Sequence, residues 1–290
     1  MSLPSNSLPE PEEDRPQPIA TEYIRLEPEQ PPTPLLQPVP VVPSAPRFPA
    51  WSWWDTLAVL GFTLFAVFVF SIIALAIARH LPAYHHLPLA DLAIDARIVV
   101  GAQAAAYPLV VIFIFLLVRS RSYERFRDAI RWNWPGISAP GFFIGGTVLA
   151  LLVEGLSSFL PIPKSLPMDK YFHDASGAYL LAAFGMSLAP LLEELFFRGM
   201  LYPLLRRTFG FLVAVGLTAG AFAAIHGAQL GYAWGPILSI FVVGVVLTVV
   251  RARTNSVAAS FLTHCGYNFA LFAALWVASD HFRHLEKVTG

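Results

Sequence analysis

Long apolar runs separated by short polar turns dominate the chain from residue 51 onwards. Most of these runs are near the ~20 residues that an α-helix needs to cross the hydrocarbon core of a bilayer. The pattern predicts an all-α fold, a polytopic bundle of transmembrane helices with about seven spans and a range of six to eight. The predicted spans are the windows 56–78, 98–118, 138–160, 178–207, 211–229, 235–250 and 256–278.

The composition agrees with a membrane protein. Of 290 residues, 56% are hydrophobic and only 13% are charged, whereas soluble domains average about 25% charged residues. The net charge is zero and no block of basic residues occurs, so we expect no nucleic-acid partner. The single cysteine, Cys265, excludes an intrachain disulfide and a cysteine-rich metal cluster.

The first 50 residues have a different character from the rest. They hold 14 of the 25 prolines, and acidic residues outnumber arginines there. Proline removes backbone donors, and the segment offers little apolar surface to offset chain entropy. We therefore expect a disordered, Pro-rich cytoplasmic tail over 1–50 and a transmembrane helical domain over 51–290. Trp51, Trp53 and Trp54 begin that domain and predict an aromatic anchor at the membrane interface.

Arginine and lysine residues near the ends of the spans predict the orientation. Nine arginines follow the second, fourth and sixth spans, which end on the same side of the membrane. Six arginines and lysines fall on the other side, where they are mixed with aspartates. The positive-inside rule therefore places the N-terminus in the cytoplasm.

Two adjacent acids lie in the fourth span, after a proline. Pro190 predicts a fresh helix start, which would put Glu193 in the first turn of that helix. Glu194 and Arg198 are four residues apart, so they can form an ion pair along one helix face. Glu193 points about 100° away and has Phe197 at its own i+4 position. We expect Glu193 to be the reactive carboxylate and Glu194 to be a structural anchor.

Two further helices bring polar residues to the same depth. Residues 206–210 form a polar turn, with Glu193 about sixteen residues before it and His226 about sixteen after it. At 1.5 Å per residue, the two side chains lie at equal depth and can meet. His264 and Asn268 are four residues apart on one face of a third helix, where they can stabilise an oxyanion or orient a water molecule.

Polar side chains of this kind also hold membrane helices together through hydrogen bonds. A charged residue at the centre of a span nevertheless costs about 2.5 to 3.5 kcal/mol even on the lenient insertion scale. Two acids, an arginine, two histidines and an asparagine on three helices therefore favour a functional site over packing alone.

These segments resemble the CPBP family, the type II CAAX prenyl endopeptidases and bacteriocin-processing enzymes. The resemblance covers residues 178–275, the motif-bearing core. The motifs EExxxR, FxxxH and HxxxN appear here, in family order, as Glu193, Glu194 and Arg198, as Phe222 and His226, and as His264 and Asn268.

The resemblance implies an intramembrane endopeptidase that hydrolyses a peptide bond near the membrane, in a prenylated CAAX-type or a leader-type peptide. Carried over to this sequence, it implies that Glu193 and His226 activate the attacking water, and that His264 and Asn268 stabilise the oxyanion. It assigns structural and supporting roles to Glu194, Arg198 and Phe222. It further implies a multi-pass protein of a prokaryotic cell membrane, with membrane lipid and a peptide or lipidated-protein substrate as partners.

Two alternatives stay open at this point. The glutamate mechanism needs no cofactor and is favoured; because HExxH is absent, a zinc mechanism would need a site formed by Glu193, His226 and His264. The other alternative is a non-catalytic immunity or scaffold protein of the same fold. A transporter is least favoured, because no internal duplication is evident in the sequence.

Overall fold

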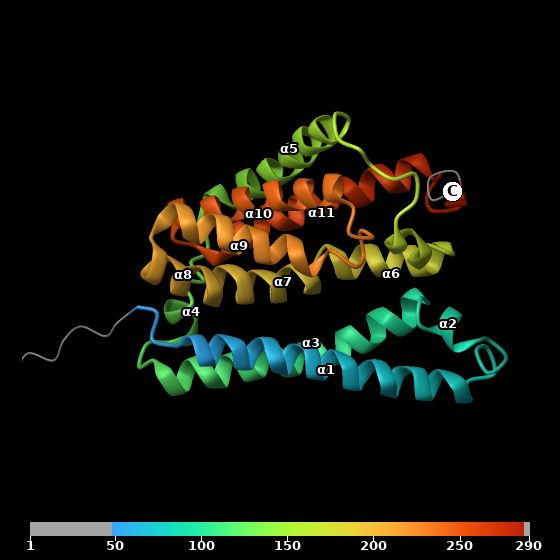
Figure 1. The fold of residues 1–290 in the computed structure, drawn as a ribbon, viewed down its shortest axis with the longest axis horizontal. Helices are drawn as coiled ribbons and strands as arrows, with labels where there is room; N and C mark the ends of the chain where they lie inside the picture. The colour runs from blue at the N-terminus through green and yellow to red at the C-terminus, as the bar shows by residue number, and fades with distance from the viewer. Residues whose placement is uncertain (1–47, 287–290) are drawn as a thin grey trace, which may run out of the picture. The chain divides into compact units, whose positions relative to one another are not determined.

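The computed structural model describes residues 48–286, which lie within one compact unit, Pro46–Gly290. The predicted disordered tail over 1–50 lies outside the described residues, except for its last three. Every regular element between residues 48 and 286 is a helix (Figure 1). Six helices are long and apolar enough to cross a membrane. The chain is an all-α, multi-pass membrane protein, as predicted.

The described part of the chain contains eleven α-helices, two 3₁₀-helices (η1 and η2) and one π-helix (η3). In order, they are α1 (Trp53–His80), α2 (Leu89–Leu92), α3 (Ala96–Arg121), α4 (Phe126–Ala129), η1 (Gly136–Ser138), α5 (Ala139–Ser157), η2 (Pro167–Tyr171), α6 (Ala175–Gly185), α7 (Leu188–Glu194), η3 (Leu195–Leu201), α8 (Tyr202–Phe209), α9 (Phe211–Ile225), α10 (Trp234–Thr254) and α11 (Val257–Ala278).

The fifth predicted span, 211–229, is shorter than expected. Its helix, α9, has 15 residues, which is about 22 Å at 1.5 Å per residue and less than the ~30 Å of a hydrocarbon core. The helix ends at Ile225, with His226 as its C-cap. The chain then turns through Gly231 and Tyr232, both in the left-handed region with φ of 59° and 56°. The turn places His226 at a helix end instead of within a continuous span.

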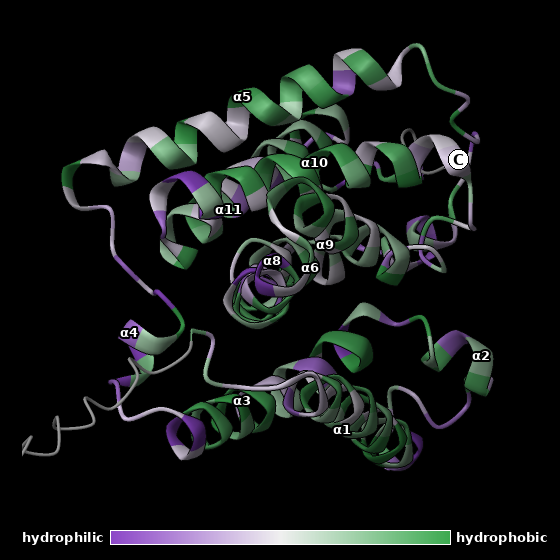
Figure 2. Cartoon of the chain, turned by 60° about the vertical axis from the view of Figure 1, so that its left-hand side comes forward, coloured by the Kyte–Doolittle hydropathy of each residue, from purple (hydrophilic) through white to green (hydrophobic). Residues whose placement is uncertain are grey.

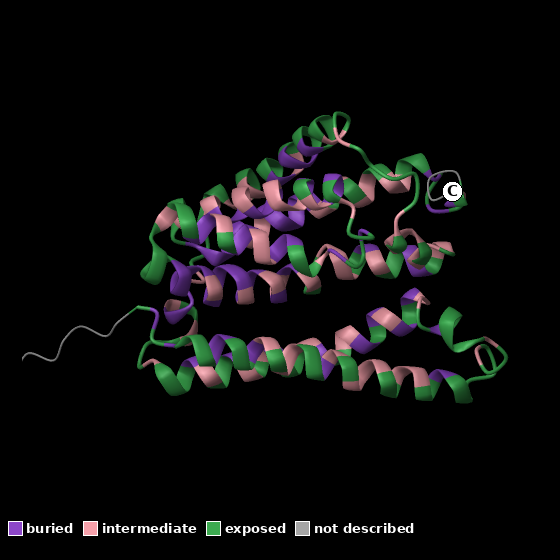
Figure 3. Cartoon of the chain, in the orientation of Figure 1, coloured by how far each residue is buried: buried purple, intermediate pink, exposed green. Residues whose placement is uncertain are grey.

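Helices α1 and α3 pack against each other as an antiparallel pair (Figure 1). Ser52 and Asp55 form a capping box at the start of α1, and Asp55 also makes an ion pair of 2.8 Å with Arg121 at the end of α3. Elsewhere α1 is largely hydrophobic (Figure 2), and exposed residues alternate along it with intermediate ones (Figure 3). Exposed apolar side chains such as Leu64 and Phe68 therefore suit contact with lipid tails.

Helices α5 and α11 approach each other backbone to backbone. A Cβ on Gly146 would overlap the carbonyl of Thr263, and one on Gly266 would overlap that of Phe143. The hydroxyl of Thr147 donates to the Gly266 carbonyl at 3.2 Å. Small residues are what allow such a close crossing in a membrane, and this crossing fixes α11, which carries two of the predicted site residues.

The fourth span is broken, but not at the predicted residue. Helix α6 ends at Gly185 and α7 begins at Leu188, so Pro190 is the third residue of α7 and not its first. Proline is tolerated throughout a first turn, where the backbone N–H has no helical partner. The placement of Glu193 in the first turn is therefore wrong, because that residue lies one turn further on.

The loops that carry the arginines of the predicted cytoplasmic side meet at one end of the bundle. Arg207 donates to the carbonyl of Pro49 at 2.9 Å, and the amide of Val257 donates to the carbonyl of Arg131 at 2.9 Å. The first contact joins the residues before α1 to the end of α8, and the second joins the loop after α4 to the start of α11. The sidedness that the sequence assigned to these loops stays a prediction.

Candidate functional site

The carboxylate of Glu194 is the centre of a buried polar cluster. Its side chain has no exposed surface, and it accepts three hydrogen bonds from two helices. The donors are Arg198 Nη1 at 2.8 Å, His264 Nδ1 at 3.0 Å and Ser260 Oγ at 2.6 Å. The predicted Glu194–Arg198 ion pair is confirmed, and Glu194 also joins α11 to the helix of the acids.

The guanidinium of Arg198 is also fully buried. Besides its bond to Glu194, it donates to the carbonyl of Gly244 at 3.0 Å and to the hydroxyl of Thr248 at 3.4 Å, both on α10. Its Cζ atom lies 4.6 Å from the centroid of the Phe222 ring. A buried charge needs a partner of opposite sign and hydrogen bonds to its remaining donors, and both are present here.

The second acid, Glu193, is less enclosed, with 20% of its side chain exposed. Its Oε2 atom lies 3.7 Å from His264 Nε2, which is longer than a hydrogen bond and is a separation that a water molecule can bridge. Because His264 uses Nδ1 toward Glu194, its other ring nitrogen faces Glu193. Glu193 thus has the more accessible carboxylate, and the neighbouring His264 is held in place by its hydrogen bond to Glu194.

His226 is half-buried at the end of α9, and its Nδ1 lies 2.8 Å from the carbonyl of Phe222. A carbonyl only accepts, so Nδ1 carries a proton and Nε2 of the neutral ring has a free lone pair. No hydrogen bond or ion pair joins His226 to Glu193 among the described residues. The predicted direct contact is absent, because the imidazole bonds back to its own helix where α9 ends.

Phe222 separates the two histidines. Its ring centroid is 4.9 Å from that of His226 and 5.7 Å from that of His264, and only 1% of the residue is exposed. The same ring lies against the Arg198 guanidinium. The supporting role that the motif implied for Phe222 stays a prediction.

The side-chain amide of Asn268 donates to the carbonyl of Gly185 at 2.6 Å. Gly185 is the last residue of α6, so this bond ties α11 to the break before α7. One of the two amide hydrogens is used in this way, and the other remains for a further acceptor. Asn268 thereby helps to set where α7 begins and where Glu193 lies.

Two parts of the site were missed from the sequence. Ser260 precedes His264 by four residues and Asn268 by eight, so a polar stripe at helical spacing along α11 could have revealed it. On α3, Tyr107 lies near Glu193, and its hydroxyl donates to Gln103 at 3.1 Å. The signal there was a pair of polar residues four apart inside an apolar span.

The possible zinc ligands do not converge. Within residues 48–286, no three histidine, cysteine or acidic side chains are arranged to hold a metal ion. Glu193 and His264 are neighbours, and His226 does not join them in such a group. The zinc alternative with Glu193, His226 and His264 as ligands stays a prediction.

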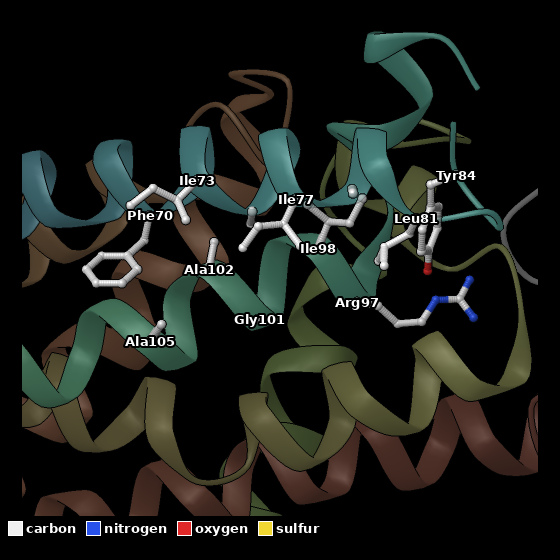
Figure 4. Close-up of a pocket in the computed structure, with 12 residues that line it drawn as sticks. Phe70, Ile73, Ile77, Leu81, Tyr84, Arg97, Ile98, Gly101, Ala102 and Ala105 are labelled. Atoms are coloured by element: carbon white, nitrogen blue, oxygen red, sulfur yellow. The ribbon is translucent and has the colours of Figure 1, made fainter. Parts of the chain in front are cut away.

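A groove of about 430 Å³ lies away from this cluster, between α1 and α3 (Figure 4). Its walls are apolar along most of their length, and Tyr84 and Arg97 lie at one end. Arg97 is held there by ion pairs to Asp95 at 3.1 Å and to Asp174 at 3.0 Å. None of the predicted site residues lines the groove.

Comparison with known proteins agrees with the motifs. Residues 175–270 match the family model of type II CAAX prenyl endopeptidases described as Rce1-like. That stretch contains every site residue predicted from the sequence, and the resemblance to this membrane protease family is confirmed.

A relative is the "Methylenomycin A resistance protein" of Streptomyces coelicolor. It is 28% identical over 218 residues, which is 70% of this chain and 42% of that protein. The chain therefore spans less than half the length of this relative. No solved structure matches the chain.

Proposed function

We propose that this protein is an intramembrane endopeptidase in which Glu193 activates a water molecule for attack on a peptide carbonyl. The observation that carries this proposal is the 3.7 Å gap between Glu193 Oε2 and His264 Nε2. It lies beside a fully buried ion pair that fixes His264. An accessible carboxylate and an immobilised imidazole, close enough for one water molecule beside them to contact both, are the parts that general-base hydrolysis requires.

The proposed reaction has two steps, attack of the water molecule and breakage of the C–N bond. Glu193 takes a proton from the water as its oxygen bonds to the carbonyl carbon, which gives a tetrahedral intermediate with a negative oxygen. The C–N bond then breaks, the carbonyl re-forms, and Glu193 returns the proton to the departing amine. The carboxylate is thus base in the first step and acid in the second.

His264 is the proposed oxyanion donor. Its Nδ1–H is used by Glu194, so the protonated form of the imidazole has a second donor, Nε2–H, for the oxyanion. The second amide hydrogen of Asn268 is the other proposed donor. Donors fixed before the reaction stabilise the intermediate without reorganising.

His226 is proposed to orient the water molecule. Its Nδ1 proton is engaged by a backbone carbonyl, which leaves Nε2 as a hydrogen-bond acceptor. With Glu193 and His226 acting on the water and His264 and Asn268 acting on the oxyanion, the division of roles implied by the motifs is kept. The water molecule replaces the direct Glu193–His226 contact.

We propose a membrane-proximal peptide as substrate, of the prenylated CAAX type or the leader type, in a prokaryotic cell membrane. The family match to CAAX prenyl endopeptidases supports the first of these substrates. The arginine-rich end of the bundle supports a cytoplasmic N-terminus.

Cleavage by the purified protein in detergent tests the proposal. The substrates are a farnesylated CAAX peptide, its unprenylated twin and a leader-type peptide. Loss of a general base lowers rates by about 10²- to 10⁴-fold, so we expect Glu193→Gln to abolish most cleavage and His226→Ala to reduce it. Glu154→Gln is the matched control, because Glu154 is an exposed glutamate in α5, apart from the site. Equal activity of Glu193→Gln and wild type would contradict the assignment.

We propose that no metal takes part. Cleavage should survive dialysis against a strong chelator, with residual zinc measured in the same sample. Activity that disappears on chelation and returns with zinc alone would overturn this part of the mechanism.

A non-catalytic resistance or immunity role is the second candidate, and the name of the Streptomyces relative favours it. Cells that carry Glu193→Gln separate the two functions. If protection from an antibiotic or bacteriocin is seen with wild type and persists in the variant, protection does not depend on catalysis.

A further inference from the structure

The helix that carries the two acids changes register directly after them. It runs as α7 to Glu194, as a π-helical segment, η3, from Leu195 to Leu201, and as α8 from Tyr202. Pro203 lies in the first turn of α8 and has no N–H. In a π-helix, the N–H of each residue donates to the carbonyl five residues earlier. Because residue 203 is a proline, the carbonyl of Arg198 lacks this donor.

A side chain from another helix supplies the missing donor. Arg251 of α10 donates from Nε to the Arg198 carbonyl at 3.2 Å, and only 2% of this arginine is exposed. Its Nη1 atom is held in turn by the side-chain oxygen of Asn255 at 3.0 Å. Buried backbone carbonyls need a partner, and here an arginine takes the place of the proline's amide.

A second donor reaches the same segment from the start of the chain's first span. The indole Nε1 of Trp51 donates to the carbonyl of Met200 at 3.1 Å, and Trp51 is 1% exposed. Trp53 and Trp54 are 37% and 80% exposed. The prediction that all three tryptophans form an interface anchor is therefore wrong for Trp51, which is buried against the helix of the acids.

We propose that Trp51 and Arg251 are positioning residues for the site. They fix η3 in the register that directs the Arg198 guanidinium to Glu194, and Glu194 in turn holds His264. Neither side chain contacts the reacting groups, so both act through the backbone of η3. The catalytic part of this inference rests on the proposed function, whereas the part concerning the register of η3 does not.

The test combines kinetics with hydrogen exchange on the full-length protein. Trp51→Phe removes the N–H and keeps an aromatic ring, and Arg251→Met removes the guanidinium. We expect each to lower kcat about tenfold with KM within twofold, and to speed amide exchange across residues 195–205. Trp54→Phe and Arg253→Met are the matched controls, since both wild-type side chains are exposed, and they should behave as wild type.

A rescue distinguishes positioning from loss of fold. Pro203→Ala restores a backbone N–H to the helix, so Arg251→Met should recover most of its kcat and its slow exchange when combined with Pro203→Ala. A general loss of stability would not be repaired by adding one amide at residue 203.

The outcomes separate the two proposals. If wild type shows no Glu193-dependent cleavage, the proposed function fails, and the exchange data still decide the role of the two donors. If wild type cleaves and both variants keep wild-type kcat per folded molecule, the positioning role is refuted. Should Trp51→Phe fail to fold, Arg251→Met with and without Pro203→Ala decides the question, and absence of rescue overturns the inference.

Discussion

Removing one member of the buried ion pair should be more damaging than removing both. In Arg198→Met, the carboxylate of Glu194 stays buried without its cation, because both side chains have no exposed surface. Breaking such a pair by deleting one partner costs about 3 to 5 kcal/mol. A protein with a net stability of about 5 to 15 kcal/mol would lose a large share of it.

The double variant Glu194→Leu/Arg198→Met removes both charges together. Ser260 keeps an acceptor, since its hydroxyl also lies 3.0 Å from the carbonyl of Leu247. His264 is then left with an unpaired Nδ1–H, for which about 1 to 3 kcal/mol is expected. We therefore expect the double variant to be destabilised by about 1 to 3 kcal/mol, less than the single variant.

Reversible unfolding in mixed micelles, followed by tryptophan fluorescence, measures both free energies. Both variants should be inactive. In the double variant, His264 loses the Glu194 carboxylate that holds it, and in Arg198→Met that carboxylate loses the cation that fixes it. A double variant that is less stable than Arg198→Met would refute the reasoning, since it would mean that the unpaired Glu194 carboxylate carries no penalty.

Three further predictions follow from single contacts. Thr218 has the one buried side-chain oxygen without a partner in the described residues, so Thr218→Val should stabilise the protein by about 1 kcal/mol. Thr248→Val, at an equally buried hydroxyl that is hydrogen-bonded, should destabilise it, and thermal unfolding compares the two. Gly266→Leu should lower the melting temperature sharply or prevent folding, because a side chain there collides with the backbone of α5. The Ser176 hydroxyl donates to the carboxylate of Asp174. This bond, together with the backbone N–H of Gly177 and the charge of Arg97, holds the pKa of Asp174 below its ordinary value of 3.8. This stabilisation is present above pH 4 and disappears as the pH falls through the folded pKa, so melting temperatures of Asp174→Asn should depend less on pH in that range.

The local parts of the site followed from spacing alone. Glu194 and Arg198 pair because residues four apart lie on one helix face, and the same rule put His264 and Asn268 together on α11. The difference between the two adjacent acids that the spacing predicted is seen in their burial. Glu194 is buried and bonded, whereas Glu193 keeps an exposed edge.

The contacts between helices were predicted less well. Equal depth suggested that Glu193 meets His226, but depth does not fix the rotation of a helix about its axis or the place where it ends. The end of α9 at Ile225 lets His226 bond to its own helix, and Glu193 faces His264 instead.

The sequence by itself determined the class of protein, most of the spans and the set of polar residues available for chemistry. Apolar length and helical periodicity are local properties, and each helix satisfies its own backbone whatever its neighbours are. Only the tertiary structure decided how those residues pair. It brought Ser260 to Glu194, used Arg251 and Trp51 to satisfy carbonyls of the π-helical segment, and placed Glu193 beside His264. These choices depend on helix crossings, breaks and rotations, which arise from contacts between segments far apart in the chain.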